Sequence, residues 1–489
     1  MVWRLFLFAF FSSPLMAILS EERVAYSQLA PCSLADALAF DRVHPTGAFH
    51  VKIADRVHQL VGHDVIGELP FLTQVVRRSF SDAQLAVVDR VSSHFPHRQL
   101  SGFRITSKEK LFELPSEAID IASALALYES EDPWERRQIE AKIDLIALEV
   151  QGYLPKNPTP DQTIDAINRV LFFDHRYHFP PDSRALPEIA KYSSLRHVID
   201  SQQGVCLGVT LLYFAIAQRL ALPLLMVTPP GHIYLRLEKG MYPRNMETTA
   251  RGIHLPDHRY ASYIPQEHPI RTVKEAIGLL LMNRAGEFQY RGDYEQALSE
   301  YLEAMHYLCE DPLLHASLGY MFLLTGNMHE GKEALYRAIQ LDGHRGIVRF
   351  LPQDLLLGKV SLGALRLLLS LEDKEKRKKR ETLEMLCHQH PHSRALLFEL
   401  ISLLLEEGQE EEAVARLLQC HACDREDPMV LYLLCYLALQ RLDYQQAWEW
   451  WVALRKHDIS PESLKVLTDP LKAEVPHLMV KMDQLIAIT

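Results

Sequence analysis

Three residues in the middle of the chain have the types and the order of a cysteine nucleophile, a general base and an orienting acid. Cys206 stands at the front of a strongly apolar stretch, His232 opens an alternating segment, and Glu247 follows shortly after. A thiol at a helix N-terminus is activated when an imidazole takes its proton and an acid orients that imidazole. If this chain does chemistry, we expect it at these residues.

A buried helix would position the cysteine. Residues 206–220 are mostly Leu, Val, Phe, Ile and Ala, and Pro223 ends the pattern. The N–H groups and the dipole of a helix start favour negative charge, so they would stabilise the Cys206 thiolate. The backbone N–H of Cys206 could also contribute to an oxyanion hole, with Gln202 and Gln203 as further donor candidates.

A β-hairpin would carry the base and the acid. Residues 232–238 alternate with period two, which predicts a strand, and Lys239-Gly240 is a plausible two-residue turn. That turn pairs Glu238 with Met241 and therefore places Glu247 opposite His232, with Cβ atoms about 5 Å apart. Asn245 lies on the same face and is the alternative third member. A proline in the return strand indicates an edge or a bulge, so the third position stays open between these two residues.

The same stretch contains motifs of a known family. They are Ile167-Asn168-Arg169-Val170-Leu171-Phe172, Gly204-Val205-Cys206 with Leu211, Tyr213, Ala215, Ala217, Arg219, Leu220 and Leu222-Pro223, then Pro230-Gly231-His232 and Asn245-Met246-Glu247-Thr248-Thr249. On these motifs, residues from about 113 to 270 resemble the transglutaminase-like domain of a bacterial family in which tetratricopeptide repeats follow, a family named after an invasion-gene regulator. The resemblance implies a papain-like fold, in which a helix with the nucleophile packs on an antiparallel sheet with the base. It assigns Cys206 as nucleophile, His232 as general base and Glu247 to the position that transglutaminases usually fill with Asp.

Such a site would support acyl transfer. His232 would take the thiol proton, Cys206 would attack a carbonyl, and the acyl group would pass to water or an amine. The residues do not distinguish a peptidase or amidase from an acyltransferase. Because many members of the family lack the cysteine, the alternative is a non-catalytic adaptor in which the former active-site cleft serves only as a scaffold.

The C-terminal half contains a 34-residue repeat. Gly292-Asp293-Tyr294 recurs as Gly326-Asn327-Met328, and Gly408 with Ala413 recurs as Leu442 with Ala447. This period is typical of tetratricopeptide repeats, whose helix pairs stack into a curved solenoid. We therefore expect a protein or peptide partner on the repeats, although they could also only brace the catalytic domain.

Composition argues against several other classes. With a net charge of −11, the chain is a poor candidate for non-specific binding to nucleic acid or anionic membranes. The basic run 374–380 is interrupted by an acid and is typical of a solvated helix or hinge, so we expect no nucleic-acid partner. The seven cysteines form no disulfide framework, and the lone pair Cys420 and Cys423 lacks a second ligand pair. We therefore expect no metal and no cofactor.

The N-terminus resembles a secretory signal peptide at 1–20, with a short basic start, an apolar stretch and possible cleavage after Ala17. We expect a periplasmic or secreted protein if this signal is real and a cytoplasmic one otherwise. No stretch is long enough for a secure membrane span.

The expected domains follow the signal peptide in order along the chain. They are an N-terminal region of unknown type (21–112), the transglutaminase-like domain (113–275), repeats (276–345), a degenerate helical connection (346–380), and repeats with C-terminal helices (381–489). The predicted fold is an α+β papain/transglutaminase-like domain followed by an all-α tetratricopeptide solenoid, mostly helical overall.

Overall fold

The computed structural model describes residues 79–474, apart from 181–185, 230, 239–242, 261–267, 344–346, 349, 371–375, 458 and 460, together with a few positions between 26 and 53. The predicted signal peptide at 1–20 and the predicted turn at Lys239-Gly240 lie outside the described residues, as does most of 21–78.

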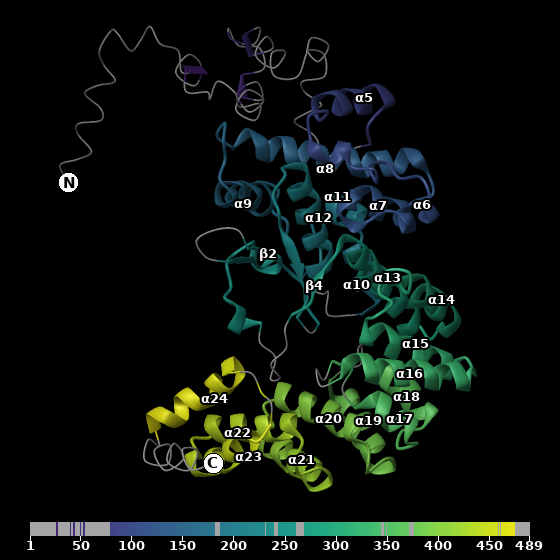
Figure 1. The fold of residues 1–489 in the computed structure, drawn as a ribbon, viewed down its shortest axis with the longest axis vertical. Coiled ribbons are helices and arrows are strands. Elements are labelled where there is room, and N and C mark those ends of the chain that lie inside the picture. Colours follow the sequence, from purple (N-terminus) through teal and green to yellow (C-terminus); the bar gives the residue numbers. More distant parts are fainter. Residues whose placement is uncertain are drawn as a thin grey trace, which may run out of the picture. The chain divides into compact units, whose positions relative to one another are not determined.

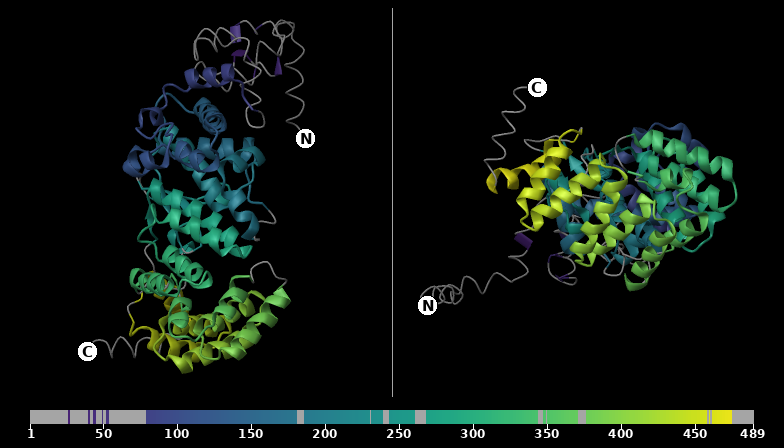
Figure 2. Two further views of the ribbon diagram at one scale, coloured as in Figure 1. Left: turned by 90° about the vertical axis from the view of Figure 1, so that its right-hand side faces the viewer. Right: turned by 90° about the horizontal axis from the view of Figure 1, so that it is seen from below.

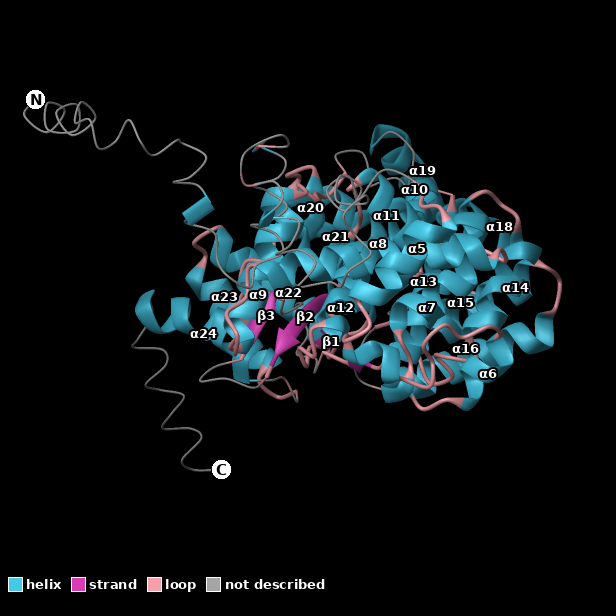
Figure 3. Ribbon diagram, turned by 90° about the horizontal axis from the view of Figure 1, so that it is seen from above, coloured by secondary structure: helices cyan, strands magenta, loops and turns pink. Residues whose placement is uncertain are grey.

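Contacts within the chain define two compact units. The first comprises Met1–Pro180, Tyr192–Leu225 and Leu235–Ile253, and the second comprises Pro181–Lys191, Met226–Tyr234 and His254–Thr489. Among the described residues helices predominate in both units, and the few strands are short (Figures 1 and 3). This confirms the predicted mostly helical fold class.

In its described residues, the first unit is a helical bundle with one two-stranded ladder. Its helices are α5 (Asp82–Val91), η3 (Pro96–Gln99), α6 (Lys108–Glu113), η4 (Ser116–Ala118), α7 (Ile121–Glu129), α8 (Pro133–Gly152), α9 (Pro160–Asn168), the π-helical η5 (Arg169–Asp174), α11 (Leu195–Ser201), α12 (Cys206–Arg219) and η6 (Thr248–Ala250), and α10 (Leu186–Ser193) has residues in both units. Side-chain caps begin several of them, as at Asp120, Asp132 and Thr159. The helices α7, α8 and α11 pack around α12, which is buried along most of its length. The buried helix predicted for 206–220 is thus confirmed.

Two glycines allow α12 to approach its neighbours closely. A Cβ at Gly208 would lie 2.3 Å from the carbonyl oxygen of Tyr192, and one at Gly204 would lie 2.8 Å from Val209 and 2.9 Å from Val198. Only a residue without a side chain fits at such separations. The start of α12, where Cys206 stands, therefore has a fixed place against the end of α10 and against α11.

The ladder of the first unit joins β2 (Tyr234–Leu237) and β3 (Arg244–Met246). Leu235 pairs with Met246, Arg236 with Asn245 and Leu237 with Arg244. The predicted register, with Glu238 opposite Met241, is therefore wrong by two residues, because the connection between the last paired residues spans 238–243. Glu247 is not opposite His232 in this register, and Asn245 is opposite Arg236 instead of Tyr234. A shift of two leaves every side chain on its face of the ladder, whereas a shift of one would reverse it.

The second unit begins with a short ladder and continues as helices. In the ladder, β1 (Leu225–Val227) pairs with β4 (Ile270–Arg271), with Met226 opposite Arg271 and Val227 opposite Ile270. The helices are η7 (Asp257–Arg259), α13 (Val273–Tyr290), α14 (Tyr294–Ala304), α15 (Pro312–Leu324), α16 (Met328–Asp342), α17 (Leu351–Leu356), α18 (Leu362–Leu369), α19 (Lys376–Gln389), α20 (Arg394–Glu406), α21 (Glu410–Cys423), α22 (Pro428–Gln440), α23 (Tyr444–Leu454) and α24 (Pro461–Glu474). Figure 2 shows the helices of this unit stacked in succession.

The turns inside the helix pairs explain the repeated sequence. Gly292, Gly326 and Gly408 have φ angles of +79°, +91° and +71°, and Leu442 takes the same place with φ +59°. Glycine is favoured there because a side chain strains the left-handed backbone. Two pairs of alanines recur at the same 34-residue spacing, Ala304 with Ala338 and Ala413 with Ala447, and all four are fully buried. The structure therefore has the predicted repeat fold of helix pairs.

Two arginines of the basic run at the start of α19 form ion pairs with acids. Arg380 contacts Glu384, Glu407 and Glu412, and Arg377 contacts Glu381.

In the part of the chain that the structure describes, no helix combines the length and the apolar character needed to cross a membrane.

Candidate functional site

Cys206 is the first residue of α12 and is partly exposed. Val205 precedes it as the N-cap, and its side chain makes no capping hydrogen bond. The first N–H groups of the helix consequently have no side-chain oxygen from the cap, and they are donors available to an anion at the helix start. A thiolate at Cys206, or an oxyanion formed beside it, would find these donors.

The segment before Cys206 is held by backbone hydrogen bonds. The N–H of Gly204 donates to the carbonyl of His178 over 3.2 Å, and the N–H of Val205 donates to the carbonyl of Tyr192 over 3.1 Å. Gln202 has a left-handed backbone at the end of α11, and Gln203 forms a bridge with His178. The two glutamines therefore lie in the turn that leads into α12.

Glu247 is buried and organises its own turn. Its carboxylate caps η6 by accepting the N–H of Thr249 over 3.1 Å and the Thr249 hydroxyl over 2.5 Å. Its backbone oxygen accepts the N–H groups of Ala250 and Gly252. These hydrogen bonds within residues 247–253 fix the backbone position from which the Glu247 side chain extends.

One hydrogen bond joins this turn to the cysteine helix. The hydroxyl of Thr210, one turn along α12 from Cys206, lies 2.9 Å from the hydroxyl of Thr248. Both threonines are buried. The structure therefore brings together the helix of Cys206 and the turn of Glu247, two parts of the predicted site.

Asn245, the alternative third member, is buried in β3. Its Oδ1 accepts a hydrogen bond from Nε of Arg236 on the facing strand over 3.0 Å. This contact gives Asn245 a role inside the ladder, whereas the carboxylate of Glu247 belongs to the turn beside α12.

His232 belongs to the second unit, while Cys206, Asn245 and Glu247 belong to the first. The N–H of His232 donates to the carbonyl of Pro229, which closes the turn before β2. Its ring stacks on Tyr260 at 6.1 Å and 19°, and Tyr260 stacks on Tyr234 at 3.9 Å and 13°. The imidazole is thus held by an aromatic stack within its own unit.

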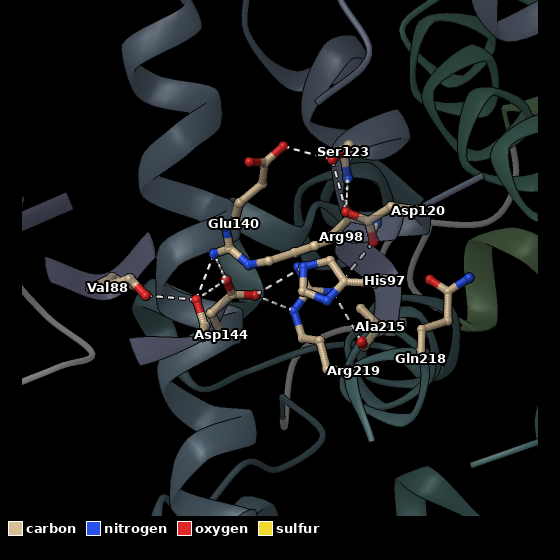
Figure 4. Close-up of polar contacts among 12 residues, drawn as sticks. Val88, His97, Arg98, Asp120, Ser123, Glu140, Asp144, Ala215, Gln218 and Arg219 are labelled. Carbon is tan, nitrogen blue, oxygen red and sulfur yellow. Dashed lines mark hydrogen bonds and ion pairs between the residues drawn. The ribbon is translucent and has the colours of Figure 1, made fainter. Parts of the chain in front are cut away.

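A buried ionic cluster at the other end of α12 was not predicted from the sequence. We call it the Arg219 cluster, and it comprises His97, Arg98, Asp120, Ser123, Glu140, Asp144 and Arg219 (Figure 4). Arg219 donates from Nε to Asp144 over 2.6 Å and lies 3.3 Å from Asp120. In the sequence Arg219 was named only as one residue of the family motif that follows Cys206. The signal that could have revealed the cluster is a pair of charges, Arg219 and Asp144, inside otherwise apolar helical runs.

The charges in this cluster set each other's ionisation. Burial, together with nearby Arg219, lowers the pKa of His97 to about 4, so this imidazole is neutral near pH 7. Burial alone would raise the pKa of Asp120, but Arg219 beside it holds that pKa below its usual value. Burial and neighbouring Asp120 raise the pKa of Glu140 to about 6. The Arg219 cluster therefore anchors the end of α12 opposite Cys206.

Comparison with known proteins supports the assignment of a transglutaminase-like domain. Residues 137–275 match the family described as the Transglutaminase-like superfamily, and this range includes Cys206, His232, Asn245 and Glu247. The predicted resemblance to a transglutaminase-like domain is therefore confirmed over residues 137–275, while the predicted start at 113 and the narrower resemblance to the invasion-gene-regulator family stay predictions. No curated protein matches the chain.

Among solved structures, the crystal structure of the P58(IPK) tetratricopeptide-repeat domain is similar at 12% sequence identity. The similarity covers 90% of this chain and 98% of that chain, with a TM-score of 0.20. This TM-score is too low to bear on the fold, so the assignment of the repeats rests on the 34-residue period and the helix pairs.

Proposed function

We propose that the transglutaminase-like domain is a cysteine hydrolase or acyltransferase with Cys206 as its nucleophile. The observation that carries this proposal is the place of Cys206, partly exposed at the uncapped start of the buried helix α12 in a domain that matches the transglutaminase-like superfamily. A thiolate needs neighbouring donors or positive charge, and a helix start supplies both.

In the proposed reaction His232 is the general base. It takes the proton from Sγ of Cys206, and the thiolate attacks a carbonyl carbon of the substrate. The N–H of Cys206 donates to the oxygen that becomes negative. His232 returns its proton to the leaving group, which leaves an acyl-thioester on Cys206. Water or an amine then attacks the thioester, and the thiol is released.

Glu247 is the proposed partner of His232, in the role of orienting the imidazole and stabilising its charged form. Two observations favour it over Asn245: its turn is joined to α12 by the Thr210–Thr248 hydrogen bond, and Asn245 is already engaged by Arg236. A carboxylate also stabilises an imidazolium more than an amide does.

We further propose that the repeats bind a protein or peptide and so recruit the substrate. The support is the succession of helix pairs with regular turns at Gly292, Gly326 and Gly408. Stacked helix pairs of this kind form extended surfaces that suit peptides and helices.

The test is the pH dependence of alkylation at Cys206, read by mass spectrometry of the full chain in the wild type and in His232→Ala. Cys309 is exposed and lies in the other unit, so it serves as an internal control. We expect Cys206 to react quickly well below about pH 8.5, where an ordinary cysteine titrates. We also expect this advantage over Cys309 to disappear in His232→Ala. If Cys206 and Cys309 label alike in both proteins, Cys206 is structural and the non-catalytic adaptor becomes the better reading.

A further inference from the structure

The side-chain amide of Asn168, the last residue of α9, sits between the cysteine helix and the turn of Glu247. The hydroxyl of Tyr213, two turns along α12 from Cys206, donates to Oδ1 of Asn168 over 3.1 Å. Nδ2 of Asn168 donates in turn to the carbonyl of Gly252 over 3.2 Å. The amide thus uses its acceptor toward α12 and its donor toward the turn.

Gly252 is shaped to receive this amide. It has a left-handed backbone with φ +71°, and a Cβ there would lie 2.0 Å from Oδ1 of Asn168. No other residue type can approach so closely. The N–H of Gly252 donates to the carbonyl of Glu247 over 2.8 Å, so whatever holds Gly252 also holds the backbone of Glu247.

The helix α9 also holds the strand on the other side of Glu247. Arg244 in β3 contacts Asp161 over 3.1 Å and Asp165 over 2.8 Å, both of which lie in α9. The backbone is therefore tied to α9 three residues before Glu247 and five residues after it.

The chain changes its helical geometry directly after Asn168. Residues Arg169–Asp174 form a π-helical segment, whose wider turn inserts an extra residue relative to an α-helix. Such segments are uncommon and are frequent at functional sites.

We propose that Asn168 is a positioning residue that sets where the carboxylate of Glu247 stands relative to α12. This inference rests on the proposed function, because the position of the Glu247 carboxylate affects the reaction only if Glu247 orients His232. Asn168 acts through the turn and is not a catalytic residue.

Asn168→Asp separates the two hydrogen bonds of the amide. An aspartate can still accept from Tyr213, but it has no N–H for the carbonyl of Gly252 and its second oxygen repels that carbonyl. We expect a fall of about fivefold to tenfold in the rate of Cys206 alkylation at low pH, the effect of losing one orienting hydrogen bond. The same change at a repeat turn, Asn327→Asp, should leave the rate unchanged.

The decisive measurement compares this change with Glu247→Gln. If Asn168 acts through Glu247, Asn168→Asp lowers the rate in the wild type but has no further effect in Glu247→Gln. Equal effects in both backgrounds would overturn the inference, as would a wild-type rate in Asn168→Asp. If Asn168→Asp fails to fold, Asn168→Ser, which removes the amide without adding charge, replaces it with the same two outcomes.

Failure of the proposed function gives a different result. In that case His232→Ala itself leaves Cys206 alkylation unchanged. If His232→Ala and Glu247→Gln both slow the reaction and Asn168→Asp does not, only the role of Asn168 is wrong.

Discussion

The hydroxyl groups of Thr210 and Thr248 lie 2.9 Å apart in the interior of the first unit. Thr210 stands one turn after Cys206 and Thr248 is the neighbour of Glu247. Two segments far apart in the sequence, which carry the proposed nucleophile and the proposed acid, are therefore joined by a buried hydrogen bond between hydroxyl groups.

Removing both of these hydroxyls should destabilise the first unit by less than the sum of the two single removals. Thr210→Val leaves the Thr248 hydroxyl buried without its partner, which should destabilise the contact by about 1–3 kcal/mol. The double change Thr210→Val with Thr248→Val replaces both groups by apolar ones of the same shape and should cost less than the sum of the single changes. Native-state hydrogen exchange of α12 in the full chain measures the local free energy of opening. Additive costs would show that the hydroxyls do not depend on each other.

Two glycines inside helices should respond in opposite ways to the same substitution. Gly208→Ala in α12 places a methyl group 2.3 Å from the carbonyl of Tyr192, so we expect a destabilisation of about 1–3 kcal/mol. Gly286→Ala in α13 meets nothing within 4 Å and should stabilise that helix by up to about 1 kcal/mol. Thermal unfolding of both variants measures the two effects. A stable Gly208→Ala protein would show that α12 has room to move away from Tyr192.

Local patterns were sufficient to predict the elements that carry the site. The apolar run after Cys206 and the proline beyond it predicted α12, and the recurring glycines predicted the turns of the repeats. The hairpin register depended on the length of one connection, and the two-residue turn assumed for Lys239-Gly240 is shorter than the 238–243 connection that the ladder requires. A pattern of alternating residues gives the faces of a strand, but not its register.

The Arg219 cluster could not be predicted, because its members come from distant parts of the sequence. Arg219 and Asp144 are 75 residues apart, and Arg219 and Asp120 are 99 apart. A single charge in an apolar helix gives no sign of which partner neutralises it until the helices are packed together. Asn168 was singled out only as part of a family motif for the same reason, since its contacts lie 45 and 84 residues away.

In the last repeat turn, the backbone strain at one residue can be relieved by substitution. Leu442 takes a left-handed backbone where Gly292, Gly326 and Gly408 stand in the other turns, and its side chain is 68% exposed. A side chain in this conformation costs about 1–2 kcal/mol. Glycine would remove this cost, but part of the gain is offset because glycine gives the unfolded chain more conformational freedom. We therefore expect Leu442→Gly to stabilise the C-terminal repeats by up to about 1 kcal/mol, measured by urea unfolding. Gly408→Leu is the matched reverse change and should destabilise them, and a loss of stability in Leu442→Gly would show that Leu442 makes a contact worth more than the strain.

The first unit should lose stability as Glu140 ionises. Ser123 Oγ lies 2.7 Å from Glu140 and 2.8 Å from Asp120, and it also accepts the N–H of Arg104. One hydroxyl hydrogen cannot serve two carboxylates, so a proton on Glu140 completes the arrangement. The pKa of Glu140, raised to about 6 from 4.5, agrees with this. Because the folded state then binds more protons than the unfolded state, stability falls by about 2 kcal/mol as the pH rises from about 4.5 to about 6.

Glu140→Gln tests this dependence, because glutamine has the shape and the donor of the protonated acid. Its amide can donate to Ser123 while its oxygen accepts from Arg104, so no group at this position titrates. Relative to the wild type, the variant should gain about 2 kcal/mol across that pH window, measured by hydrogen exchange of α8 in the full chain. Glu113→Gln, an exposed position at the end of α6, controls for the loss of a surface carboxylate. A pH dependence of stability that is unchanged in Glu140→Gln would mean that Glu140 is already ionised below this window and that Ser123 donates to only one of its two neighbours.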